Sequence, residues 1–174
     1  TSQLALALVN WLATLLVPVA LIFLALRLLA SSFFLDVEYH LPHFPEDEYG
    51  FTLQERLEYG NECILYLTGK TDIEHLAALT FADGAPLFNE RELSHMEDVK
   101  VVFQNAVVAH WMMTGFYPVT IIVLATRKKM TGFWLSLQRG GWYTIGLTGF
   151  ILAAVAISFN TLFTVFHSLF FEGE

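Results

Sequence analysis

Cysteine and basic residues are scarce in this 174-residue chain. Cys63 is the only cysteine, so an internal disulfide is excluded. Its neighbours Glu62 and Ile64 provide neither a metal-ligand nor a redox spacing. We therefore interpret Cys63 as a buried apolar residue and expect no metal site. The chain has nine Lys and Arg residues against 17 Asp and Glu, a net charge of -8. Because nucleic-acid partners need a basic surface, this balance argues against one.

Apolar residues are abundant instead. They make up 55% of the chain, and the mean hydropathy is +0.54. This exceeds the apolar share of ordinary soluble domains. Three apolar runs, at residues 4–35, 101–125 and 142–164, match the length of about 20 residues that a membrane-crossing helix needs. The sequence therefore predicts a mostly α-helical, polytopic membrane helix bundle whose three spans belong to residues 1–35, 101–126 and 142–174.

Residues 36–100 have a different composition. They contain every acidic residue of the chain except Glu172 and Glu174. Thr52 to Glu55 is a capping-box pattern, which predicts the start of an amphipathic helix. Gly69 fits the position just after the end of that helix. At about 65 residues the segment is too small to bury a large core by itself. We expect a small acidic cap domain between the first and second spans.

The basic residues gather in the second connection. Residues 127–141 contain four of them and no acid: Arg127, Lys128, Lys129 and Arg139. Because cytoplasmic loops of membrane proteins are enriched in Lys and Arg, we expect this segment to be a cytoplasmic loop. The acidic cap and the C-terminal end are then expected on the outer, extracytoplasmic side.

Two histidines are expected at similar depth on that outer side. Ser94 and Glu97 form a second capping-box pattern, which predicts that a helix starts at His95. His95 would lie about 9 Å above the apolar start of the second span. His167 follows Trp142 by about 37 Å along a straight helix, which exceeds the hydrocarbon thickness of about 30 Å. That the two imidazole rings face each other is a hypothesis.

These stretches resemble the lipoprotein intramolecular transacylase family of bacterial membrane proteins. That family pairs a His-x-x-Asp-Val-Lys motif with a second histidine at the outer end of a later span. The motif is present here as His95–Lys100, and the second histidine stands in Phe166–Phe171. Glu58-Tyr59 and Tyr66-Leu67 resemble the tyrosine-bearing helix of the family. Family members continue beyond the position of Glu174 with a tryptophan-containing segment and a fourth span. We therefore expect a shortened or repurposed member, or a part of a longer one.

The resemblance implies an acyltransferase of the bacterial cytoplasmic membrane. An ester-linked acyl chain of a diacylglyceryl-cysteine lipoprotein would move to the N-terminal amine of the same lipoprotein, without a cofactor. Membrane lipids and the diacylated lipoprotein are the partners this implies. The amine must lose a proton and the leaving alkoxide must gain one, and two histidines can do both near neutral pH.

The positions of the histidines on their helices suggest separate roles. A helix N-terminus disfavours imidazolium and a C-terminus favours it, so we expect His95 to act as the base and His167, near a helix end at Phe171, as the acid. Asp98, one turn after His95, is expected to orient it. Tyr66 and Asn160 are expected to support the site, Asn160 by bonding His167 or by bridging helices.

Two polar residues inside the spans leave alternatives open. Arg27 is predicted to bind a lipid phosphate or a carboxylate, or else to reach the outer headgroups. His110 lies about 22 Å along the helix from His95, near mid-membrane. It is expected to bond a polar group on a neighbouring helix, such as Asn10 or Thr14, or to be the axial ligand of a buried haem or chlorin.

Two other functions are compatible with the sequence. His110 and the sixteen phenylalanines are compatible with a non-catalytic structural subunit of a larger membrane complex. Such a respiratory or photosynthetic subunit, of reaction-centre or antenna type, would pack helices, pigments or a quinone channel and hold bound lipid, chlorin or haem. The third interpretation is a lipid-binding or receptor module whose acidic cap recruits partners.

Overall fold

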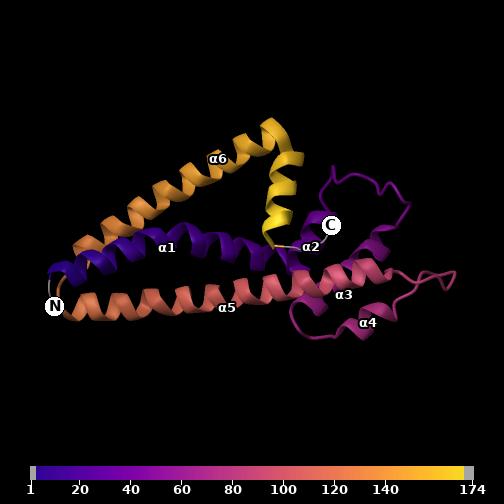
Figure 1. Cartoon of the computed structure of the whole chain (residues 1–174), viewed down its shortest axis with the longest axis horizontal. Coiled ribbons are helices and arrows are strands. Elements are labelled where there is room, and N and C mark those ends of the chain that lie inside the picture. Colours follow the sequence, from indigo (N-terminus) through magenta and orange to yellow (C-terminus); the bar gives the residue numbers. More distant parts are fainter. Residues whose placement is uncertain (1–2, 171–174) are drawn as a thin grey trace. The chain divides into compact units, whose positions relative to one another are not determined.

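The fold is almost entirely helical. The computed structural model describes residues 3–170. Figure 1 shows their six α-helices: α1 (Gln3–Leu29), α2 (Ser32–Tyr39), α3 (Leu53–Leu67), α4 (Ile73–Ala77), α5 (Glu90–Thr126) and α6 (Met130–Phe170). Within these residues there is no strand, and Thr80 and Pro86 form an isolated bridge. The helices α1, α5 and α6 are long and apolar enough to cross a membrane. The predicted mostly α-helical protein with three candidate spans is confirmed.

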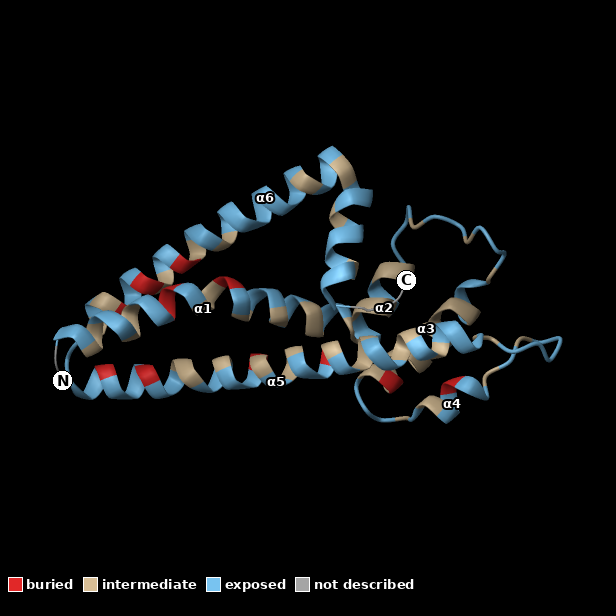
Figure 2. Ribbon diagram, in the orientation of Figure 1, coloured by how far each residue is buried: buried red, intermediate tan, exposed pale blue. Residues whose placement is uncertain are grey.

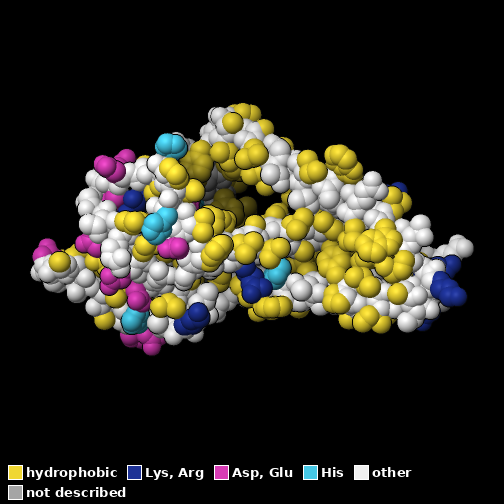
Figure 3. Space-filling model, turned by 180° about the vertical axis from the view of Figure 1, so that it is seen from behind, with side chains coloured by type: hydrophobic (Ala, Val, Ile, Leu, Met, Phe, Trp, Pro, Cys, Tyr) yellow, Lys and Arg dark blue, Asp and Glu magenta, His cyan; other side chains and the backbone are white. Residues whose placement is uncertain are grey.

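The described part of the chain divides into two compact units. We call Ala25–Val107 the middle unit, and residues 3–24 together with 108–170 the terminal unit. In Figure 3 the acidic side chains gather over the surface of the middle unit, whereas the surface of the terminal unit is mainly hydrophobic. This surface pattern follows the change of composition along the sequence.

The terminal unit has a small core where its three long helices meet. Ala13 of α1, Leu124 of α5 and Phe133 of α6 are buried together. Tyr117 of α5 packs against this core and donates a hydrogen bond from its hydroxyl to the Ala13 carbonyl, at 3.1 Å. Figure 2 shows that the buried residues of α6 lie in its first half. The remainder of α6 presents apolar side chains outward, as a helix in lipid does.

Close approach of α6 to α1 explains why part of an expected loop is helical. Residues 127–141 were predicted to form a loop, but α6 begins at Met130, so only residues 127–129 connect α5 to α6. A Cβ atom at Gly140 would lie 2.6 Å from Val17 Cβ and 2.8 Å from the Thr14 carbonyl oxygen. Glycine disfavours a helix, but its small size permits this contact between helices, which offsets the cost.

A kink in α6 was also absent from the sequence interpretation. Ser158 has φ -161° and ψ 90°, which are not helical values, and α6 bends visibly in Figure 1. Its hydroxyl oxygen accepts a hydrogen bond from the Thr161 amide at 3.3 Å, as an N-cap does. The last segment of α6 therefore starts anew after Ser158. The straight-helix distance from Trp142 to His167 was wrong for this reason.

The first apolar run also ends earlier than expected. It was predicted to extend as one span to residue 35, but α1 ends at Leu29. The Ser31 hydroxyl accepts a hydrogen bond from the Phe34 amide at 3.2 Å and caps a second helix, α2. A polar cap inside an apolar run thus separates the span from a short helix of the middle unit.

The middle unit is built around α3. The predicted capping box is confirmed: Thr52 Oγ1 accepts from the Glu55 amide, and the Glu55 carboxylate accepts from the Thr52 amide at 2.8 Å. Gly69 follows the helix with φ 77°, as its predicted place requires. Gly60 faces α2, where a Cβ atom would lie 2.9 Å from Leu35 Cδ2. On the other side, His75 of α4 lies 2.7 Å from the carboxylate of Glu62.

Candidate functional site

His95 lies one turn deeper in its helix than the sequence suggested. The helix α5 begins at Glu90, and Asn89 and Glu92 form the capping box instead of Ser94 and Glu97. Asn89 Oδ1 accepts from the Glu92 amide at 3.0 Å, and the Glu92 carboxylate accepts from the Asn89 amide at 2.9 Å. The predicted helix start was wrong because the intervening residues are good helix formers and an earlier cap is present.

This position changes the electrostatic argument for His95. The imidazole is half-buried in the second turn of α5. Helix-dipole effects fall off beyond the first turn. The helix N-terminus therefore no longer distinguishes His95 as the base. Asp98, expected to orient His95, is an exposed residue of the same helix.

The lysine that ends the histidine motif is held by α3 and the turn after it. Lys100 Nζ lies 3.9 Å from the centroid of the Tyr66 ring and donates a hydrogen bond to the Thr71 carbonyl at 3.1 Å. Tyr66 is 2% exposed. Burial, and then the charges of Glu97 and Glu74, raise the pKa of the Tyr66 hydroxyl, so this group stays protonated at neutral pH. Tyr66 thus joins α3 to the motif helix through Lys100.

His167 stands in the final turn of the described part of α6. Its ring packs against Phe163, with 4.3 Å between the ring centroids. It belongs to the segment that follows the kink at Ser158, and so does Asn160, which is exposed. The expected helix end at Phe171 lies outside the described residues. His167 belongs to the terminal unit and His95 to the middle unit, so their pairing stays a prediction.

The remaining candidates lie within the first and second spans. Arg27 is half-buried in the last turn of α1. His110 is 6% exposed, and its Nε2 atom lies 3.3 Å from the hydroxyl of Thr114 in the same helix. Among the described residues, His110 Nδ1 and Asn10 Oδ1 are both buried without a hydrogen-bond partner. The expected bond between these two residues is therefore not formed. The expected haem or chlorin ligation by His110 stays a prediction.

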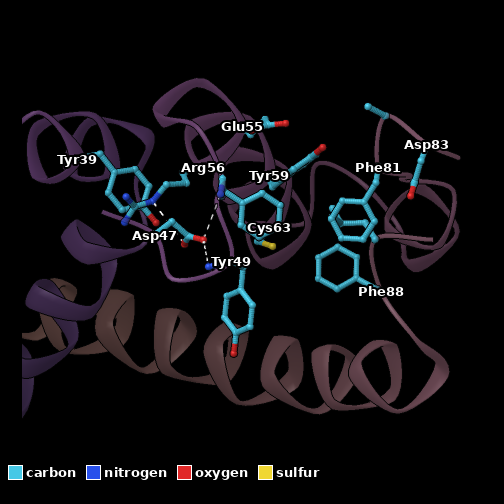
Figure 4. Close-up of a pocket in the computed structure, with 14 residues that line it drawn as sticks. Tyr39, Asp47, Tyr49, Glu55, Arg56, Tyr59, Cys63, Phe81, Asp83 and Phe88 are labelled. Atoms are coloured by element: carbon cyan, nitrogen blue, oxygen red, sulfur yellow. Dashed lines mark hydrogen bonds and ion pairs between the residues drawn. The ribbon is translucent and has the colours of Figure 1, made fainter. Parts of the chain in front are cut away.

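The middle unit also contains an open cavity of about 930 Å³, which sequence reasoning missed. Figure 4 shows residues from α2, α3 and the connecting segments around it. Its lining includes six aromatic residues, three carboxylates, one guanidinium and one thiol: Tyr39, Asp47, Tyr49, Phe51, Glu55, Arg56, Tyr59, Gly60, Cys63, Phe81, Ala82, Asp83, Leu87 and Phe88. The lining comes from separate segments, and its only sequence signal was the many aromatic residues between Tyr39 and Phe88.

Arg56 organises one side of this cavity. Its guanidinium carbon lies 4.6 Å from the centroid of the Tyr39 ring and 4.8 Å from that of Phe44. Arg56 Nη1 donates to the Pro45 carbonyl at 3.1 Å, and Nε lies 4.0 Å from Asp47 Oδ2. The other oxygen of Asp47 accepts from the Tyr49 amide at 2.9 Å, as the dashed lines in Figure 4 indicate. These contacts hold the loop between α2 and α3 against α3.

The thiol of Cys63 also lines the cavity. Burial raises its pKa, and the nearby charge of Glu62 acts in the same direction. The thiol is therefore neutral at physiological pH, which fits the predicted role of Cys63 as an apolar residue rather than a nucleophile.

Nearly the whole chain is similar to known proteins. A family model described as "Lipoprotein intramolecular transacylase Lit" matches residues 11–174. A protein of Aquifex aeolicus (strain VF5), named only "Uncharacterized protein", is 25% identical over 149 residues. That alignment covers 86% of this chain and 66% of the relative, so the chain spans just under two thirds of the relative's length. No solved structure matches.

Proposed function

The chain belongs to the lipoprotein intramolecular transacylase family, and from this premise we propose that it transfers an acyl chain within a diacylated lipoprotein. The substrate is a lipoprotein whose N-terminal cysteine carries a diacylglyceryl thioether and a free amine. The amine nitrogen attacks one ester carbonyl, a carbon–nitrogen bond forms, and the ester carbon–oxygen bond breaks. The product is an N-acylated lipoprotein with one acyl chain fewer on its glycerol. The family match over residues 11–174 is the observation that carries the proposal.

Two histidines perform the proton transfers in this proposal. One imidazole accepts the proton that the attacking amine loses, and the other gives a proton to the leaving alkoxide. His95 and His167 are the candidates because each stands in a motif like that of the family. Since His95 lies beyond the first turn of α5, we assign the base and the acid to the pair and not to either residue. Holding the amine and the ester in one molecule supplies part of the acceleration.

The membrane location of the reaction is part of the same proposal. Three helices suited to crossing a membrane support a multi-pass membrane protein. The basic connection after α5 supports a cytoplasmic position for Arg127–Lys129. The acidic segment of residues 36–100 is then the extracytoplasmic cap, and both histidines act at the outer leaflet. Arg27 is in the last turn of α1, and its binding of a lipid phosphate at the same membrane boundary is part of the proposal.

The test uses the full chain in lipid nanodiscs and a synthetic diacylated lipopeptide with one isotope-labelled ester chain. Mass spectrometry of the peptide follows the label from the glycerol to the amine. Removing a group that transfers a proton usually lowers the rate by about 10²–10⁴-fold, so His95→Ala and His167→Ala should each do so. His43→Ala, at an exposed loop residue, is the control and should keep normal turnover. Near-normal turnover by either of the first two variants would remove that histidine from the mechanism.

A further inference from the structure

The cavity of the middle unit has a net negative lining. Its one guanidinium, that of Arg56, is already engaged by Asp47, by the Pro45 carbonyl and by two aromatic rings. The carboxylates of Glu55 and Asp83 also line the cavity and have no cationic partner among the described residues. An anionic ligand would meet these two charges without a free cation to bind it, whereas a cationic ligand would neutralise them.

Each of these two carboxylates uses one oxygen locally. Glu55 Oε2 accepts from the amide and the hydroxyl of Thr52, at 2.8 and 2.7 Å. Asp83 Oδ1 accepts from the Ala85 amide at 3.0 Å. The bonds from Thr52 also lower the pKa of Glu55, so its carboxylate is ionised at neutral pH. Local bonds therefore fix both side chains while the second oxygen of each carboxylate remains for a ligand.

Aromatic rings form much of the remaining cavity wall. Phe51 lies 5.8 Å from Tyr59 and 5.9 Å from Phe81, measured between ring centroids. Tyr59 and Phe81 are 6.3 Å apart and perpendicular, so the three rings form one packed cluster. Aromatic faces attract organic cations, and they also cover the aliphatic stem of a lysine side chain. Figure 4 shows Tyr59 and Phe81 between the side chains of Glu55 and Asp83.

We infer that this cavity binds a lysine side chain of the lipoprotein substrate, from the polypeptide that follows the lipid-modified cysteine. The inference rests on the proposed function, because that function supplies a polypeptide leading away from the membrane. A four-carbon stem suits the aromatic rings, and an ammonium is attracted by both carboxylates, so a lysine side chain matches the lining in chemistry and charge. The cavity then selects substrates by their peptide sequence, at a place separate from the acyl chains.

The test compares two lipopeptides that differ only in having lysine or glutamine after the cysteine. The variant is Glu55→Gln combined with Asp83→Asn, which removes both charges. Glutamine serves in a capping box as glutamate does, and Asn-Gly is a favourable turn, so both local hydrogen bonds are retained. The control is Glu48→Gln combined with Glu90→Gln, which removes two charges from exposed residues that do not line the cavity.

For the unchanged protein we expect the lysine peptide to have a KM about fivefold lower than the glutamine peptide, the size expected for two partly exposed charge contacts. The double variant should lose this difference in KM, while its kcat for the glutamine peptide is unchanged. The control variant should keep the difference in KM. Equal KM values for the two peptides, or a difference that survives in the variant, would overturn the inference.

A binding measurement separates this inference from the proposed function. Fluorescent forms of the same two peptides are titrated with the protein in nanodiscs, with and without phosphatidylethanolamine. Selective binding of the lysine peptide without turnover would support the cavity and contradict the transacylase proposal. Turnover without selective binding would support the transacylase proposal and contradict the binding of lysine in the cavity. Loss of lysine selectivity only when phosphatidylethanolamine is present would mean that the lipid ammonium occupies the cavity, and the peptide assignment would be overturned.

Discussion

Substitution of Gly140 by alanine tests the contact between α1 and α6 with a single methyl group. Carbon atoms in ordinary contact are about 3.5–4.0 Å apart. The added Cβ would lie 2.6 Å from Val17 Cβ and 2.8 Å from the Thr14 carbonyl oxygen, so one helix must move by about 1 Å. Pro18 has no amide hydrogen, so the Thr14 carbonyl lacks the usual donor four residues later in the helix.

The magnitude follows from two opposing terms. Overpacking usually costs about 1–3 kcal/mol, and the helix propensity of alanine returns up to about 1 kcal/mol. Gly141→Ala is the matched control, because a Cβ atom there meets nothing within 4 Å and only the propensity gain remains. We therefore expect Gly140→Ala to be less stable than Gly141→Ala by about 1–3 kcal/mol.

Reversible unfolding in mixed detergent micelles, followed by circular dichroism, measures this difference. A lower midpoint for Gly140→Ala than for both the unchanged protein and Gly141→Ala is the expected result. Equal midpoints for the two variants would refute the close contact, and with it the reason given for the helical conformation of residues 130–141.

Three further predictions concern the middle unit. Lys100→Met should destabilise the protein by about 1–2 kcal/mol in the same unfolding assay, because it removes both the cation–π contact with Tyr66 and the hydrogen bond to Thr71; an unchanged midpoint would contradict that role. The folded-state pKa of Glu55 is lowered, so its stabilising effect is present above the ordinary pKa of about 4.3 and is lost as the pH falls through the lower folded value; Glu55→Gln should abolish this part of the acid dependence of the unfolding midpoint. Alkylation of Cys63 should reach half its maximal rate above the ordinary thiol pKa of about 8.5, because burial raises its pKa, and a lower value would contradict the neutral thiol.

Local sequence patterns predicted some helix ends and missed others. The cap at Thr52 and the glycine at position 69 were correct, since each acts through adjacent residues alone. The predicted cap at Ser94 was wrong because Asn89 offers the same pattern about one turn earlier. The pattern alone does not say which of the two residues starts the helix. Ser158 adds a cap inside an apolar run, where composition favours a continuous helix.

Features that depend on packing between distant segments were not visible in the sequence. The helical state of residues 130–141 depends on how closely α6 approaches α1. The glycines permit a close approach of the two helices but do not by themselves predict it. The contact of Lys100 with Tyr66 joins two helices, although both residues stood in the motifs already singled out. The cavity combines side chains from several segments without a common spacing. His95 and His167 were recognised by motif, and their pairing is still a prediction.

The central claim is that this chain moves an acyl chain within a lipoprotein by means of two histidines. The most direct measurement is mass spectrometry of lipoprotein N-termini from bacterial cells that lack the gene and from the same cells carrying the gene, its His95→Ala variant or its His167→Ala variant. We predict N-acylated lipoproteins with a single glycerol acyl chain only in cells with the unchanged gene. Diacylated lipoproteins with a free amine in every strain, or the N-acylated form in a histidine variant, would contradict the account.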